Sequence, residues 1–343
     1  MRNGILRFND AYIVSSGSVV GKKEFEGPLG ECFDLHDSTD RFGKKTWESS
    51  ESEMQRLALN LALSKLDEEK REIDAIFAGD LLNQCVGSSY GLIDFDVAYF
   101  GLYGACSTAI EGLMLSSMVC DAGYFNTCAA VTSSHYCSAE RQYRTPLEYG
   151  AQRSPTAQWT VTGSGAFVVG RENKSRERGV KVTEALPGIV IEMGINDASN
   201  MGAAMAPAAA DTIFRYFNDS GRDVCELDAI ITGDLGKEGG EILCELLSSR
   251  GIDLGARYND CGIMIYDLAG QDVHAGGSGC GCSAVVLASY LLPRLRSGLL
   301  KDILIIGTGA MMSPSSIQQG EAIPAVAHLL RLTADKEEEE WRA

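Results

Sequence analysis

Several features that mark common protein classes are missing from this sequence. Its longest apolar stretches, such as residues 283–292, fall far short of the roughly 20 residues that a helix needs to cross a bilayer. The first residues lack the apolar core of a signal peptide. We therefore expect a soluble chain without a signal or transmembrane segment, which reaches any membrane only through partners.

Positive charge is scarce. The 343 residues include 30 lysines and arginines against 47 aspartates and glutamates, so the net charge is -17 with neutral histidines. Such an excess of negative charge argues against nucleic acid as a partner and against electrostatic binding to anionic lipid. An anionic ligand would need a local positive pocket or a counter-ion.

Motifs for metals and nucleotides are also missing. None of the 11 cysteines is spaced as Cys-x-x-Cys, and no group of histidines and cysteines has zinc-site spacing. The glycine-rich run at residues 276–281 lacks the lysine and the spacing of a P-loop. The sequence therefore predicts no metal site and no cofactor, and its cysteine usage suits a reducing compartment.

Strand-like and helix-like patterns alternate along the chain in two successive rounds. The expected helices are residues 50–66, 203–217, 239–249 and 283–295, and the expected strands are residues 73–78, 125–132, 228–232, 262–266 and 303–306. Alternation of this kind predicts an α/β fold with mostly parallel sheets covered by helices. A charged stretch, residues 171–179, has the composition of a linker, so we expect two similar halves, residues 1–172 and 178–343.

Cys106 is the most distinctive residue of the first half. An apolar stretch at residues 97–103 leads to it, and apolar residues at one-face spacing follow, including Ile110 and Leu113. The cysteine is thus expected at a strand-to-helix turn, where the helix N-terminus would stabilise a thiolate and make Cys106 more reactive than the other cysteines. A small buried core thiol is the alternative interpretation.

Together, Cys106 and two glycine-rich turns at residues 162–166 and 303–310 resemble the thiolase superfamily, in particular its ketoacyl synthase III type. The resemblance covers nearly the whole chain. It implies a thiolase-like five-layered α/β/α/β/α sandwich of two similar halves, usually dimeric, with Cys106 in the nucleophile position. We expect the apolar strand at residues 125–132 to form the interface of a homodimer.

The chain departs from active synthases of this type in its catalytic residues. Where those enzymes carry a His-Gln-Ala-Asn run, this sequence reads Thr-Gly-Asp-Leu-Gly, with Asp234 near the position of the missing histidine. His274 stands in place of the asparagine of the family. Because a cysteine nucleophile needs both a base and oxyanion donors, the machinery for condensation is incomplete. Asp234 itself is expected to be solvated or to cap a helix.

A closer resemblance is carried by the long strings at residues 132–144, 155–163 and 202–211, which are similar to the stage V sporulation protein AD family of spore-forming bacteria. The resemblance implies binding of dipicolinic acid or its calcium chelate and support of its uptake into the developing spore. It further implies a peripheral place at the forespore or spore inner membrane, beside the other membrane proteins of the stage V sporulation A operon. It implies no enzymatic turnover.

The expected ligand site combines cationic, aromatic and small polar groups, because dipicolinate is a flat ring with two carboxylates. The residues expected to bind it are Cys106, His135, Arg141, Trp159, His274 and Ser278, with Cys106 as a vestigial nucleophile. An ordinary alternative is that Arg141 pairs with Glu140 or Glu148 at a subunit interface.

Three hypotheses follow from the sequence. The first is a ligand-binding protein on a catalytically degenerate thiolase scaffold, and the second is a ketoacyl synthase III-like acyltransferase that uses Cys106 as its nucleophile. The third is a structural subunit with a vestigial pocket. The missing histidine favours the first and third hypotheses over the second.

Overall fold

The first half of the chain forms a five-stranded mixed sheet. The computed structural model describes residues 4–143, 153–171 and 179–335. Along the sheet the strands run β5 (Ala98–Gly101), β4 (Ala75–Gly79), β6 (Thr127–Ser134), β8 (Gly163–Gly170) and β2 (Tyr12–Val20). β4 is parallel to β5 and β6, whereas β8 is antiparallel to β6 and β2.

The second half repeats this arrangement. Its strands run β11 (Tyr258–Asp260), β10 (Ala229–Thr232), β13 (Asp302–Ala310), β14 (Ala325–Ala334) and β9 (Val180–Leu186). β10 is parallel to both neighbours, and β14 is antiparallel to both of its own. The two sheets join where Tyr12 and Ile13 of β2 pair with β9. Short strands β1 (Leu6–Arg7) and β3 (Leu35–His36) add to β9 and β2.

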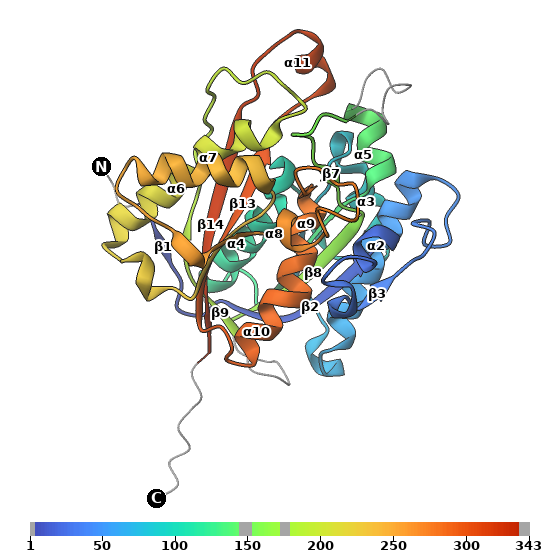
Figure 1. The fold of residues 1–343 in the computed structure, drawn as a ribbon. Helices are drawn as coiled ribbons and strands as arrows, with labels where there is room; N and C mark the ends of the chain where they lie inside the picture. Colours follow the sequence, from blue (N-terminus) through green and yellow to red (C-terminus); the bar gives the residue numbers. More distant parts are fainter. Residues whose placement is uncertain (1–3, 144–152, 172–178, 336–343) are drawn as a thin grey trace, which may run out of the picture.

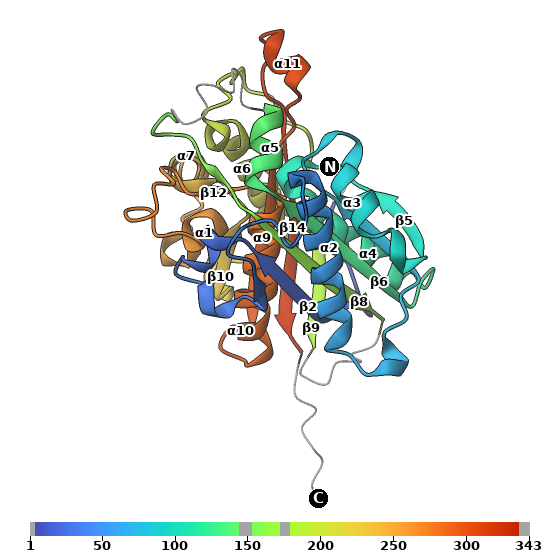
Figure 2. The same cartoon turned by 90° about the vertical axis from the view of Figure 1, so that its right-hand side faces the viewer.

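Helices complete the layers (Figures 1 and 2). α2 (Trp47–Ser64) and α3 (Val86–Gly91) cover the first sheet, and α6 (Met201–Ser220) and α7 (Gly236–Ser248) cover the second. Between the sheets lie α4 (Thr108–Asp121), α9 (Cys280–Val286) and, after a π-helical turn, α10 (Leu292–Arg296). The shorter helices are α1 (Lys22–Phe25), α5 (Tyr136–Tyr143), α8 (Cys261–Met264) and α11 (Pro314–Gln318). The predicted thiolase-like layered α/β fold is confirmed. The expectation of mostly parallel sheets is wrong, because each sheet has as many antiparallel as parallel pairs.

The sequence of α4 explains its central position. Ile110, Leu113 and Met114 are buried, and small residues occupy most of the remaining surface, so the helix is apolar nearly all round. Two glycines of β13, Gly307 and Gly309, let the first turn of α4 approach the second sheet closely. A Cβ atom on Gly307 would lie 2.7 Å from the Cβ of Ile110, and one on Gly309 would lie 2.3 Å from the carbonyl oxygen of Gly104. The residues just before α4 are therefore held between the two halves.

Several expectations need correction. Residues 261–264 form the short helix α8 rather than the predicted strand at residues 262–266, and the strand of this region, β11, comes just before it. Strand β6 is paired along both edges, so the strand at residues 125–132 is not an open interface edge, and that expectation is wrong. The open edge of the first sheet belongs to β5. The boundary between the two predicted halves falls on residues 172–178, outside the described residues.

Candidate functional site

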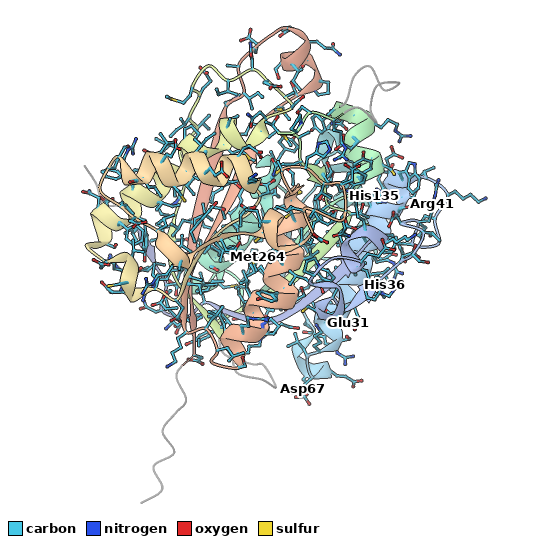
Figure 3. The ribbon with its side chains drawn as sticks, in the orientation of Figure 1. Glu31, His36, Arg41, Asp67, His135 and Met264 are labelled. Carbon is cyan, nitrogen blue, oxygen red and sulfur yellow. The ribbon has the colours of Figure 1, made fainter. Side chains whose placement is uncertain are left out.

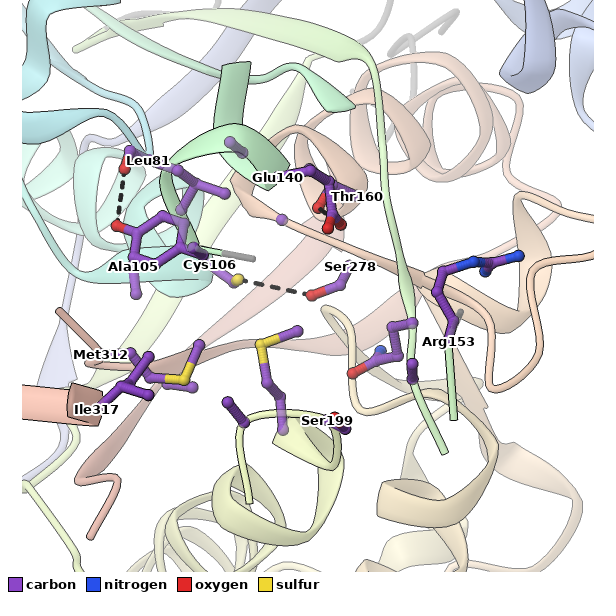
Figure 4. A pocket seen from close by; sticks show the side chains of 18 of the residues that line it. Leu81, Ala105, Cys106, Glu140, Arg153, Thr160, Ser199, Ser278, Met312 and Ile317 are labelled. Atoms are coloured by element: carbon purple, nitrogen blue, oxygen red, sulfur yellow. Dashed lines mark hydrogen bonds between the residues drawn. The ribbon is translucent and has the colours of Figure 1, made fainter. Parts of the chain in front are cut away.

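A cavity of about 320 Å³ lies at the junction of the two halves (Figure 4). Its wall combines the turn before α4, helix α5 and the strand pair β7 (Trp159–Thr160) and β12 (Gly277–Ser278) with residues 198–201 and 310–317. Cys106 and Ser278 lie side by side in this wall, with Sγ and Oγ 3.8 Å apart. Met312 and Ile317 lie on one side of this pair, and Glu140 and Thr160 lie on the other.

Cys106 occupies a tight turn, as predicted. It lies in a 3-10 turn, Ala105–Ser107, that leads directly into α4, and only 6% of the residue is exposed. Ala105 has a φ of +50°, a left-handed conformation that is unfavourable for a residue with a Cβ atom. The backbone thus accepts strain in order to present the cysteine at the cavity.

Asp234 lies directly behind the Cys106–Ser278 pair. Its Oδ2 accepts hydrogen bonds from the Ser278 hydroxyl at 2.8 Å and the Gly279 backbone N–H at 2.9 Å, and its Oδ1 accepts from the Thr308 hydroxyl at 2.6 Å. Only 1% of Asp234 is exposed, so the expectation of a solvated or helix-capping aspartate is wrong. Burial raises the pKa of Asp234, and the three donors counteract this effect.

The surroundings of Cys106 favour a neutral thiol. Burial, the negative charge of Asp234 and the hydrogen bond between the two groups raise the pKa of Cys106 well above its ordinary value. Hydrogen bonds from Ser278 and the Gly279 backbone act in the opposite direction but are weaker. Burial beside a carboxylate therefore argues against the expectation that the helix N-terminus makes Cys106 the most reactive thiol, and that expectation stays a prediction.

The structure brings only two of the six predicted binding residues to the cavity, Cys106 and Ser278. His135 is fully buried elsewhere, where its Nε2 donates to the carbonyl oxygen of Asp40 at 2.9 Å and its Nδ1 accepts from the Cys137 N–H. Figure 3 shows it near Arg41, on the side of the molecule that carries α2. Burial lowers the pKa of His135, so the neutral ring serves as a structural link to residue 40.

Arg141 and His274 also lie outside the cavity wall. Arg141 is half-exposed and forms an ion pair with Glu48. In His274, Nδ1 lies 2.6 Å from the carbonyl oxygen of Ser154 and Nε2 lies 3.1 Å from Asp272, so both ring nitrogens are occupied. Neither side chain lines the cavity at Cys106, so the structure does not bring either one to the expected position, and their part in ligand binding stays a prediction.

Trp159 stands behind the cavity wall rather than in it. Its ring stacks on Tyr136, with centroids 3.9 Å apart, while its neighbours Gln158 and Thr160 line the cavity. The guanidinium of Arg153 lies 4.8 Å from the centre of the Trp159 ring and binds Asp272, directed away from Cys106 (Figure 4). Trp159 is thus held by Tyr136 and Arg153 rather than presented to the cavity.

The cavity also contains residues outside the predicted binding set, namely two tyrosines and two apolar segments. Tyr103 and Tyr143 form a hydrogen-bonded pair at 2.8 Å, and the Tyr143 hydroxyl donates to the carbonyl oxygen of Leu81 at 2.9 Å. Residues 198–201 and 310–317 form the apolar side from two distant parts of the chain. Nothing local in the sequence marks these segments, because only the tertiary fold brings them together.

The chain resembles known proteins in both sequence and fold. Residues 3–333 match the family described as stage V sporulation protein AD (SpoVAD). The chain is 43% identical over 317 residues to stage V sporulation protein AD of Bacillus subtilis (strain 168), with 92% of each chain covered.

Solved structures of similar fold include 3-oxoacyl-(acyl carrier protein) synthase III, FabH, of Pseudomonas aeruginosa PAO1, with a TM-score of 0.58 and 14% identity over 96% of this chain and 99% of that one. A single-residue variant of Xanthomonas campestris OleA has a TM-score of 0.57 and 15% identity over 95% and 99% of the two chains. At these identities the likeness concerns the fold alone.

Proposed function

Because the chain belongs to the stage V sporulation protein AD family and is a sporulation protein, we propose that its cavity binds dipicolinic acid, free or as the calcium chelate, without turning it over. In this role the protein supports the uptake of dipicolinic acid into the developing spore. The observation that carries the proposal is the cavity at Cys106, where the thiol touches Ser278 and the buried carboxylate of Asp234 lies behind the pair.

The dimensions and lining of the cavity suit a small, flat ligand. Its volume of about 320 Å³ is at the small end of the range for ligand pockets. Apolar side chains of Met201, Met312 and Ile317 offer a surface for an aromatic ring. Thr160 and Ser278 place hydroxyl oxygens in the wall. Because their hydrogens are donated to Glu140 and Asp234, these oxygens suit a calcium-bound ligand better than a free carboxylate. A planar pyridine with polar groups on one edge fits this division.

The charges around the cavity bear on the form of the ligand. Glu140 lines the cavity and Asp234 lies behind it, whereas the guanidinium of Arg153 is held by Asp272. Arg153 is the one cation among the described residues that line the cavity, and Asp272 holds part of its charge, so a free dianion meets little net positive charge there. In the calcium chelate the charges largely cancel, and a carboxylate such as that of Glu140 is a suitable additional calcium ligand. Both forms therefore have to be titrated separately.

The proposal excludes acyl transfer as the main activity. Among the described residues that line the cavity there is no histidine to take the proton from Cys106. Thioester formation requires a thiolate and donors for the oxyanion that forms on the substrate. The raised pKa of Cys106 disfavours the thiolate. The neutral thiol instead serves as a weak hydrogen-bond donor or an apolar contact.

No helix in the described part of the chain is long and apolar enough to cross a membrane. Independently of that finding, we propose a peripheral place at the forespore or spore inner membrane, where membrane proteins of the stage V sporulation A operon hold this protein. A homodimer is part of the same proposal.

Calorimetric titration tests the proposed ligand. Dipicolinate is titrated into the protein with excess chelator and then with calcium, and the wild type is expected to bind at one site per chain. Met312→Trp fills the apolar side of the cavity and should weaken binding roughly tenfold or more, the equivalent of about 1.4 kcal/mol. Arg141→Ala, outside the cavity, is the matched control and should bind as the wild type does.

Two results would refute the proposal. One is that the wild type binds neither form of dipicolinate. The other is steady formation of a ketoacyl product from acetyl-CoA and malonyl-carrier protein, monitored by mass spectrometry, which would favour an acyltransferase.

A further inference from the structure

A buried carboxyl group, that of Glu51, accepts a hydrogen bond from helix α5. Glu51, on α2, has no exposed surface. Its Oε1 accepts a hydrogen bond from the Ser133 hydroxyl at 3.0 Å, and its Oε2 accepts one from the Ser138 hydroxyl at 2.6 Å. Glu51 thereby connects α2 to the end of β6 and to α5.

A second buried carboxyl group, Asp80, lies next to the first. It follows β4 and is fully buried; its Oδ2 accepts from the backbone N–H and the hydroxyl of Ser88, and its Oδ1 accepts from the Leu82 N–H at 2.9 Å. A Cβ atom on Gly87 would lie 3.1 Å from Asp80 Oδ2 and 3.4 Å from Glu51 Cγ, so the two acids flank this glycine.

The amide of Gln55 joins the two carboxyl groups into one network. Its Nε2 lies 2.9 Å from the Ser88 hydroxyl, which binds Asp80, and 2.8 Å from the Ser133 hydroxyl, which binds Glu51. A change at either acid is therefore transmitted to the hydrogen bonds of the other.

The pair lacks a compensating cation in the part of the chain that the structure describes. Within residues 4–143, 153–171 and 179–335 neither carboxyl group forms an ion pair. The titratable groups that face the pair from other elements are Cys85, Tyr99 and Cys280, which are neutral when protonated. Two adjacent buried carboxylates without a cation are strongly unfavourable, so the pair is expected to retain a proton.

The hydrogen-bond network of Glu51 and Asp80 lies next to one wall of the cavity. Leu81, next to Asp80, and Ala139, next to Ser138, both line the cavity. The loop between Leu81 and α3 includes Gln84 and Cys85 with φ values of +54° and +52°, so its backbone is strained and depends on Asp80 to hold it. The position of this wall therefore depends on the hydrogen bonds of Asp80 and Glu51.

We propose that the Glu51–Asp80 pair makes ligand binding proton-dependent. When the pair holds a proton, α5 and the strained loop keep the geometry of the cavity wall. When both groups ionise, their repulsion displaces this wall and adds negative charge beside a site for an anionic ligand. The inference rests on the proposed function for its ligand, but the movement of the wall is a property of the chain alone.

The titration range supports a response near neutral pH. Burial, together with the charge of Asp80, raises the pKa of Glu51 to about 8, while the two serine donors lower it. Burial also raises the pKa of Asp80. The protonated form of the pair therefore dominates below pH about 8 and is lost above it.

The test compares wild type with Glu51→Gln, which is neutral at every pH and nearly isosteric. Dipicolinate affinity of the wild type should fall several-fold or more between pH 6.5 and pH 9, and up to about tenfold per pH unit above the pKa. Glu51→Gln should remove this decrease. Glu53→Gln, on the same helix and paired with Arg56 and Lys44 at its surface, is the matched control and should retain it.

A second measurement needs neither ligand nor variant. Amide hydrogen exchange of residues 81–88 and 136–143, corrected for the intrinsic effect of pH, should accelerate above pH 8 in the wild type relative to α6. Unchanged relative exchange, or a pH dependence of binding that persists in Glu51→Gln, overturns the inference. If the wild type binds no dipicolinate while the exchange responds as expected, the proposed ligand fails and the proton-dependent wall stands.

Discussion

At the scale of single residues, Asp234 determines the chemistry of Cys106. Removing its charge with Asp234→Asn should lower the pKa of Cys106, because the charge and the hydrogen bond of the carboxylate both stabilise the protonated thiol. Alkylation of Cys106 by iodoacetamide at pH 8, followed by peptide mass spectrometry, should accelerate about tenfold for each unit by which the pKa falls. In the wild type, Cys106 should react more slowly than the exposed Cys32 and Cys225.

The control for this experiment is Asp272→Asn, which removes an exposed carboxylate at the rim and should leave the rate at Cys106 unchanged. Faster alkylation of Cys106 than of Cys32 in the wild type would contradict the neutral-thiol account.

Sequence reasoning located Cys106 and Ser278, but the structure does not bring the other predicted binding residues to the cavity, for a physical reason. Cys106 is set by a local pattern, the change from strand to helix. The positions of Arg141 and His274 depend instead on the groups that bind their side chains, Glu48 and the carbonyl of Ser154. Both partners are distant in sequence. The burial of Asp234 could not be predicted either, because its partners Ser278 and Thr308 are also distant in sequence.

At the scale of secondary-structure elements, the contact between β13 and the turn before α4 should be intolerant of any side chain. In Gly309→Ala the new Cβ would lie 2.3 Å from the carbonyl oxygen of Gly104, so the cysteine turn has to move. Overpacking of this kind costs about 1–3 kcal/mol in the free energy of unfolding, measured by urea denaturation. Gly112→Ala in α4 is the control. Its Cβ would lie at ordinary distances of 3.4 to 3.6 Å from Ala130, Phe77 and Leu102, so the change should be neutral or stabilising.

The elements themselves were largely predictable, with informative exceptions. Periodicity identified α2, α6 and α7 because each has one clearly buried face. It failed at residues 262–266, where a four-residue apolar helix looks like a buried strand. The pairing of β7 with β12, which shapes the cavity, joins residues more than a hundred positions apart and leaves no local pattern.

At the scale of the whole molecule, several buried carboxyl groups should make the fold less stable at alkaline pH. Burial raises the pKa of Glu24 to about 7, that of Glu51 to about 8 and that of Asp260 to about 6. The folded state therefore binds these protons more tightly than the unfolded state does, and the stabilisation is lost as pH rises through the folded pKa values. The free energy of unfolding should fall between pH 6.5 and pH 8.5, by about 1 kcal/mol or more.

Urea denaturation at the two pH values measures this decrease, which Glu24→Gln and Glu51→Gln should each reduce. Buried His135 and His328, with lowered pKa values, oppose the trend until the unfolded imidazoles have lost their protons, about one pH unit above their ordinary pKa near 6.5. Equal stability at pH 6.5 and pH 8.5 would be inconsistent with protonated buried carboxyl groups.

The open edge of the first sheet is the expected dimer interface. β5 is exposed along its whole length, and Tyr99 and Phe100 on it, with Tyr90 and Ile93 nearby, expose large apolar side chains. An exposed apolar edge strand tends to pair with another chain, here a second copy. Light scattering should give a dimer for the wild type and a monomer for Phe100→Lys; a stable wild-type monomer at micromolar concentration would contradict this.

The central claim is that the cavity at Cys106 binds a small planar ligand without covalent chemistry. A crystal structure of the protein grown with dipicolinate and calcium tests it most directly. The account predicts ligand density between Thr160 and Met312, with a free thiol at Cys106. Density for the ligand at another site with an empty cavity, or a covalent acyl group on Cys106, would contradict it.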